Sequence, residues 1–92
     1  MVAKSITVDT HRSTIDVPEG TFRVYRQDDR YAVAREPDGS LLGYFQLELM
    51  TSGKVQVQAH TTDQLGLGTL DEARELLQII GRLAFERGLA VV

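Results

Sequence analysis

The sequence predicts an α+β fold, in which an antiparallel β-meander of four or more strands is followed by one C-terminal amphipathic helix packed on one sheet face. Two observations predict it. Polar and apolar residues alternate through most of residues 22–60, as expected of strands with one buried face. From residue 69 to residue 87 the apolar residues recur at helical spacing instead. No linker or repeat divides the chain, so residues 1–92 are expected to form a single domain.

The first part of the chain predicts two hairpins. Short alternating runs at residues 5–9 and 14–17 flank a polar link, which indicates an N-terminal hairpin over residues 5–17. The tripeptide Pro18-Glu19-Gly20 then breaks the pattern. Alternation resumes in two further runs, 22–26 and 31–35, and the polar residues between them favour a second hairpin.

The sequence Glu36-Pro37-Asp38-Gly39 predicts a tight hairpin turn with a glycine bulge. Proline sets φ for the first central position of a type I turn, and glycine takes the left-handed conformation that follows. Residues 41–49 form the longest predicted strand. On its apolar face lie Leu41, Gly43, Phe45, Leu47 and Leu49, and on its polar face Leu42, Tyr44, Gln46 and Glu48. A glycine on the apolar face indicates a bend or a bulge.

The last predicted strand begins after a turn at residues 51–53. Val55, Val57 and Ala59 are expected to face inward, since they alternate with polar residues. The outward residues are then Lys54, Gln56, Gln58 and His60.

The helix is predicted over residues 69–87. Thr69 and Glu72 fit the capping box, in which the threonine caps the backbone and the glutamate reaches back, and Gly88 is a suitable stop. A rotation of 100° per residue gathers one apolar face, made of Leu70, Ala73, Leu76, Leu77, Ile80, Leu83 and Ala84. The apolar residues 89–92 predict an ordered tail or a last edge strand.

Composition and charge restrict the function. The net charge of −3 counts against nucleic-acid binding, because such proteins usually carry a basic excess. The chain has no cysteine, which fits a reducing compartment, and we expect a cytoplasmic protein. No run of 18 apolar residues is present, so no membrane association is predicted.

The sequence offers no set of catalytic residues. His11 and His60 are far apart and lack the spacing of metal ligands, so no metal site is assigned. No serine stands in a nucleophile elbow. Gly66-Leu67-Gly68 precedes a helix but lacks the lysine and longer glycine spacing of a phosphate-binding loop. We therefore predict a protein that is not an enzyme and needs no cofactor.

Two surfaces suggest binding. Phe85 falls beside Gln78 and Gly81 on the polar side of the helix, where an uncovered apolar spot would suit a partner, unless residues 89–92 fold back over it. The polar sheet face also carries groups that stack and donate hydrogen bonds, among them Tyr44, Gln46 and Gln58.

Our leading hypothesis is a non-catalytic protein-binding module. It would be a small prokaryotic regulator, adaptor or inhibitor that contacts a protein or forms a homodimer, through the outer side of the helix, the tail or a sheet edge. The alternative is a nucleic-acid-binding module that uses the polar sheet face.

Overall fold

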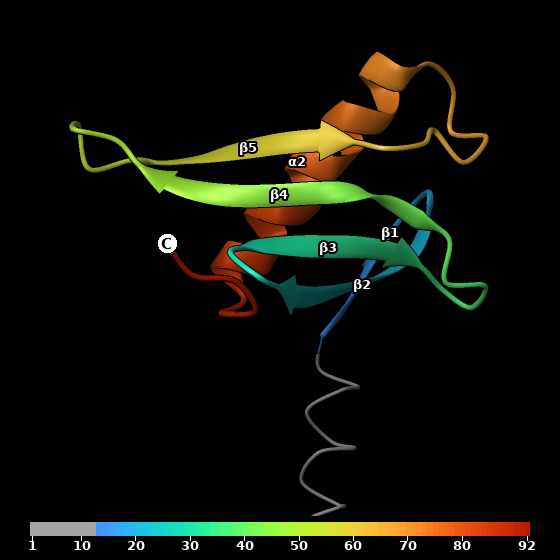
Figure 1. The fold of residues 1–92 in the computed structure, drawn as a ribbon, viewed down its shortest axis with the longest axis horizontal. Coiled ribbons are helices and arrows are strands. Elements are labelled where there is room, and N and C mark those ends of the chain that lie inside the picture. The colour runs from blue at the N-terminus through green and yellow to red at the C-terminus, as the bar shows by residue number, and fades with distance from the viewer. Residues whose placement is uncertain (1–12) are drawn as a thin grey trace, which may run out of the picture.

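In the computed structural model, which describes residues 13–92, five strands and one helix follow one another along the chain. They are β1 (Thr14–Val17), β2 (Gly20–Gln27), β3 (Arg30–Arg35), β4 (Leu41–Leu49), β5 (Val55–Thr61) and α2 (Leu70–Glu86). The strands form one antiparallel sheet in the order β1-β2-β3-β4-β5. The helix crosses behind this sheet (Figure 1), which confirms the predicted α+β meander with one C-terminal helix.

β1 belongs to the main sheet. It pairs with β2 in a register that runs from Thr14 opposite Arg23 to Val17 opposite Gly20, so a two-residue turn joins the strands. Gly20 closes the turn with φ +141°, a conformation that favours glycine. The other half of the predicted N-terminal hairpin, residues 5–9, lies outside the described residues.

The turn between β3 and β4 differs in detail from the prediction. The N–H of Gly39 donates to the carbonyl of Arg35 at 2.7 Å, so the closing hydrogen bond spans five residues rather than four. Gly39 has the expected positive φ of 74°, and the Glu36-Pro37 peptide bond is cis. The irregular register, however, lies inside the sheet and not at this glycine.

Leu42 is the extra residue of a β-bulge. Ala34 lies opposite Leu41, whereas the next residue of β3, Val33, lies opposite Gly43. A bulge of this kind interrupts the strict alternation of side chains. Leu42 is consequently buried in the core, and its predicted place on the polar face is wrong.

α2 begins with the predicted capping box and covers the sheet. The Thr69 hydroxyl accepts from the Glu72 N–H at 3.1 Å, and the Glu72 carboxylate accepts from the Thr69 N–H at 2.8 Å. The buried side of the helix contains Ala73, Leu76, Leu77, Ile80, Gly81 and Ala84. Leu70 was expected there too, yet it is exposed in the first turn. Within residues 13–92, no helix is long and apolar enough to cross a membrane.

The core lies between the sheet and α2. Its largest fully buried side chains come from strands β1 to β4 and from α2. They are Phe22, Phe45, Ile15, Leu42, Leu77, Ile80 and Val33. α2 packs on β4 and β5 and also reaches β1, since the sheet curls around it as a half-barrel. Tyr31 extends the core at one end, where its ring stacks on Phe45 with the centroids 5.3 Å apart.

The C-terminal segment is an ordered tail and not a strand. The N–H groups of Leu89 and Ala90 donate to the Ala84 carbonyl, which turns the chain back after the helix. Ala90 is buried, and the Val91 N–H donates to the Tyr31 hydroxyl at 3.0 Å. The tail therefore closes the core beside β3.

Candidate functional site

Among the strands of residues 13–92, β5 is an edge strand, because only β4 pairs with it. Hydrogen bonds from Met50 N–H to Lys54 O and from Thr62 N–H to Leu42 O fix the ladder. In an antiparallel pair, residues alternate between those that bond to the neighbour and those that do not. The even-numbered residues of β5 bond to β4, so its odd-numbered residues turn their N–H and C=O groups away from the sheet. We call this side of β5 the open edge.

A groove runs between the open edge and the flank of α2. It has a volume of about 1030 Å³. Ile79, with 53% of its surface exposed, and Met50, with 40%, are large apolar side chains in its wall. We call it the edge groove. It is lined by Met50, Thr51, Ser52, Lys54, Val55, Gln56, Val57, Glu75, Gln78, Ile79, Arg82, Leu83 and Glu86.

Gly81 determines how closely α2 approaches β5. A Cβ atom at this position would lie 2.7 Å from Val57 Cγ1 and 3.2 Å from the Phe45 ring, so no larger residue fits without movement. One residue further on, Arg82 Nη2 donates to the Val55 carbonyl at 2.7 Å. Residues 81 and 82 thus seat the helix on β5, with Arg82 bound to one carbonyl of the open edge.

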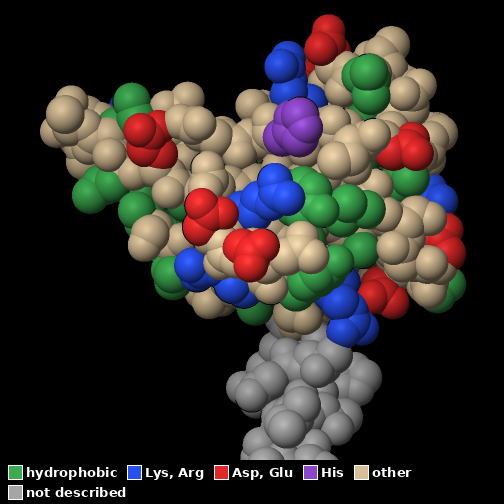
Figure 2. Space-filling model, in the orientation of Figure 1, with side chains coloured by type: hydrophobic (Ala, Val, Ile, Leu, Met, Phe, Trp, Pro, Cys, Tyr) green, Lys and Arg blue, Asp and Glu red, His purple; other side chains and the backbone are tan. Residues whose placement is uncertain are grey.

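The face of the sheet opposite α2 is a second candidate surface, which we call the outer face. Residues opposite one another on neighbouring strands share a face, and the register gives a row of Tyr25, Ala32, Tyr44 and His60. The Arg30 guanidinium lies 3.6 Å above the Tyr44 ring. Figure 2 shows hydrophobic side chains in the middle of this face, among cationic, anionic and histidine groups.

The charges on the outer face are of both signs. Arg23 Nε lies 2.6 Å from Glu36 Oε2 in an ion pair that is about two-thirds buried. Gln58 donates to Glu48, and the glutamine is thereby engaged. This face therefore offers stacking groups without a continuous cationic surface.

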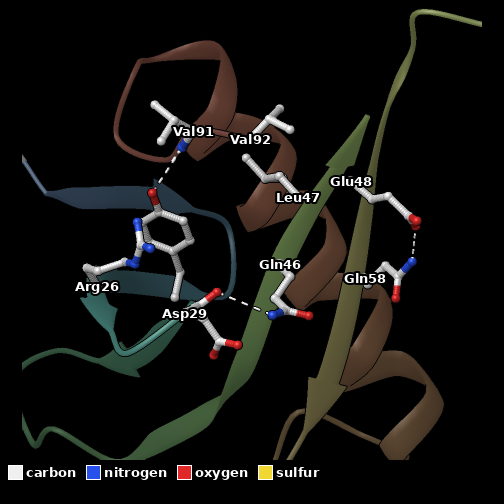
Figure 3. A pocket seen from close by; sticks show the side chains of 9 residues that line it. Arg26, Asp29, Gln46, Leu47, Glu48, Gln58, Val91 and Val92 are labelled. Atoms are coloured by element: carbon white, nitrogen blue, oxygen red, sulfur yellow. Dashed lines mark hydrogen bonds between the residues drawn. The ribbon is translucent and has the colours of Figure 1, made fainter. Parts of the chain in front are cut away.

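A third hollow lies beside the C-terminal tail and has a volume of about 330 Å³. Figure 3 shows Val91 and Val92 at one side of it and Arg26 at another. The Arg26 guanidinium lies 5.4 Å from the centroid of the Tyr31 ring. Gln46 reaches across to the Asp29 carbonyl at 3.2 Å. The Val91 N–H donates to the Tyr31 hydroxyl and Gln58 donates to Glu48, so several polar groups of the lining bond to one another.

The six residues predicted for partner binding fall on different surfaces. Gln78 is exposed and lines the edge groove, whereas Tyr44, Gln46 and Gln58 border the outer face. The structure does not bring these two groups together.

Gly81 and Phe85 differ in their exposure. Gly81 is buried against β5, so its predicted place on the polar side of the helix is wrong. Phe85 is half-buried, one residue after the carbonyl that anchors the tail.

The sequence predicts contact through a sheet edge or the outer side of the helix, but it does not predict the groove between them. Ile79 lies beside the buried stripe of the helix, and the last strand of a meander is always an edge. The strand order decides which edge meets the helix flank, and that order is a tertiary property.

The two shifted carboxyl groups have structural roles. The Ser40 N–H and then Arg35 lower the pKa of Asp38 to about 2, in the turn between β3 and β4. The Thr69 N–H lowers the pKa of Glu72 in the capping box. Neither group lies in the edge groove. Among residues 13–92, no three histidine, aspartate or glutamate residues gather in a possible metal site.

Comparison of the chain with protein-family models, curated proteins and solved structures gives no match.

Proposed function

We propose that this protein is a non-catalytic binding module that contacts another protein through the open edge of β5 and the edge groove. The observation that carries the proposal is that backbone hydrogen-bonding groups and an apolar groove lie side by side. An extended segment that adds to an edge strand gains main-chain hydrogen bonds, while its alternate side chains enter an adjacent pocket. The partner segment would thus be extended, with apolar residues at every second position.

The exposed apolar side chains support this assignment. Ile79 and Met50 stand in one groove with the half-buried Val55 and Leu83, so that a partner in the groove could remove these apolar side chains from water. Buried apolar anchors at the centre of an interface usually carry most of its binding energy. The role of a small cytoplasmic regulator, adaptor or inhibitor would follow from such a contact.

Nucleic-acid binding by the outer face is the second candidate. The observation in its favour is the Arg30 guanidinium over the Tyr44 ring, next to the row that includes Tyr25 and His60. Aromatic rings with nearby cations stack on bases in single-stranded nucleic acids. Against it stand the ion pair between Arg23 and Glu36 and the net charge of −3.

Site-specific photo-crosslinking in the native host tests the proposal. A benzoylphenylalanine at position 79 is compared with one at position 70, because Ile79 and Leu70 are 53% and 55% exposed on the same helix and only Ile79 lines the edge groove. We expect protein adducts from position 79 and far fewer from position 70. Equal yields, or no protein adduct from position 79, would overturn the proposal.

A third probe at position 58, on the outer face, tests the second candidate. Nuclease-sensitive adducts from position 58, without protein adducts from position 79, would establish nucleic-acid binding instead. The mass of each protein adduct also identifies whether the partner is another protein or a second copy of this chain.

A further inference from the structure

We infer that the extended segment that occupies the open edge is β5 of a second copy, so that two chains form a symmetric dimer with one continuous sheet. This inference rests on the proposed function and names the partner. β5 itself has the required pattern, because Val55, Val57 and Ala59 alternate with polar residues. Val57 is buried under its own helix, so β5 acts as receiving edge and as guest through its backbone groups, and the exposed Ile79 supplies the apolar contact in the groove.

The hydrogen-bonding pattern of β5 suits pairing with itself. An axis of two-fold symmetry through one β5 residue places each residue i opposite a residue j for which i + j is even. Odd-numbered residues then face odd-numbered residues, and these are the ones whose N–H and C=O groups point out of the open edge. The N–H groups of one β5 strand therefore face the carbonyl groups of the other along the whole pairing.

The charges on the flank of α2 are also self-complementary. Glu75, Ile79 and Arg82 all line the edge groove, with Glu75 one turn before the isoleucine and Arg82 about one turn after it. When two such helices lie antiparallel across a two-fold axis near residue 79, each glutamate faces the other chain's arginine. The two isoleucines meet between two identical ion pairs.

The strand and the helix flank meet in the same part of the molecule. Gly81 packs on Val57, and Arg82 bonds to the Val55 carbonyl, so the flank that carries Arg82 lies beside the first half of β5. A two-fold axis through Val57 therefore passes close to this flank in both chains.

Arg82 has one partner before association and another afterwards. In the single chain its guanidinium bonds to the Val55 carbonyl and so covers one group of the open edge. A charged side chain over an edge is a common protection against unspecific strand pairing. In the dimer the Val55 carbonyl would accept from the second chain, and Arg82 would turn to the partner's glutamate. If a strand other than β5 of a second copy paired with the open edge, Arg82 would lose the Val55 carbonyl without gaining a glutamate in its place.

Charge reversal in the full 92-residue chain tests the inference by sedimentation velocity from micromolar to millimolar concentration. We expect a dimer for the unchanged chain. Glu75→Arg and Arg82→Glu each place like charges opposite one another and should raise the dimer dissociation constant about tenfold or more. An equal mixture of the two variants should restore the dimer, because each carries the charges that the other needs. The double variant should dimerise as well.

Arg74→Glu is the matched control, since Arg74 is exposed on α2 outside the edge groove and pairs with Asp71 in its own chain. It should leave the dimer unchanged, and thermal melting should show that every variant is folded. A monomer for the unchanged chain at millimolar concentration, or a mixture that stays monomeric, would overturn the inference. If position 79 then still crosslinks to a different protein, the proposed function holds and only the identity of the partner is wrong.

Discussion

Gly81 of α2 lies so close to β5 that an added methyl group would stand 2.7 Å from Val57 Cγ1. This approach sets the depth of the edge groove and the height at which the helix crosses the sheet. It also explains why a residue with poor helix propensity occupies the fourth turn of α2.

Gly81→Ala should therefore destabilise the fold. At an exposed helix position this change stabilises a protein by about 1 kcal/mol, because alanine has the higher helix propensity. Here the methyl group overpacks the contact with Val57 and Phe45, and we expect a net loss of about 1–3 kcal/mol in the free energy of unfolding. Denaturant unfolding measures it, with Gln78→Ala as the exposed control. A more stable Gly81→Ala variant would show that the helix and β5 lie further apart at this contact than the structure gives.

The helix offers a matched pair of apolar truncations. Ile80→Ala should cost about 2–5 kcal/mol, because Ile80 is fully buried between the helix and the sheet. Leu70→Ala should change stability by less than about 0.5 kcal/mol, since Leu70 is 55% exposed. Thermal or denaturant unfolding distinguishes them. A similar loss for both variants would place Leu70 in the core, as the periodicity of the sequence predicts.

The turn between β3 and β4 should contribute stability that depends on pH. The Ser40 N–H and Arg35 hold the pKa of Asp38 at about 2, below its usual value of 3.8. A folded-state pKa below the unfolded one means that the contribution is complete above about pH 4 and is lost as the pH falls towards 2. Asp38→Asn should be less stable than the unchanged chain at neutral pH, and the difference should shrink in that acid range. Asp29→Asn, at the β2–β3 turn, is the control, and an equal pH response in both variants would contradict the assignment.

The tail should loosen when the hydroxyl of Tyr31 is removed. In Tyr31→Phe the Val91 N–H loses its acceptor at 3.0 Å, while the ring can still stack on Phe45. We expect faster hydrogen exchange at Val91 and a loss of about 0.5–1.5 kcal/mol in stability. Exchange at the Ala90 amide, which donates to Ala84, should change less. Unchanged protection at Val91 would mean that packing alone holds the tail.

Much of the fold follows from local patterns in the sequence. Thr69 and Glu72 form the capping box within four residues, so its signal needs no knowledge of the rest of the chain. The alternation at Val57 and its neighbours likewise reports one buried face. These features were predictable because each depends on residues close together in sequence.

The errors arise where distant segments decide the outcome. Gly43 predicts an irregularity in this strand, and the bulge beside it confirms this, but the inward position of Leu42 depends on how β4 pairs with β3 and not on periodicity within β4. Leu70 fits the helical stripe, but it is 55% exposed in the first turn of the helix. The sequence pattern places Gly81 on the polar side of the helix, because a glycine is neither clearly polar nor clearly apolar. The close approach of β5 to the helix is what requires a glycine at this position. The edge groove could not be predicted for the same reason, since it exists only between two elements.

The order of the elements has a consequence for biosynthesis. Each strand from β2 to β5 pairs with the strand before it, and α2 follows the sheet. A ribosome releases the chain from its first residue onwards, so the strands emerge before the helix that covers Phe22 and Phe45. Until the helix has folded, the apolar face of the nascent sheet is exposed to water, and such intermediates are prone to aggregate. A chain truncated before Leu70 should therefore depend on a chaperone to stay in solution.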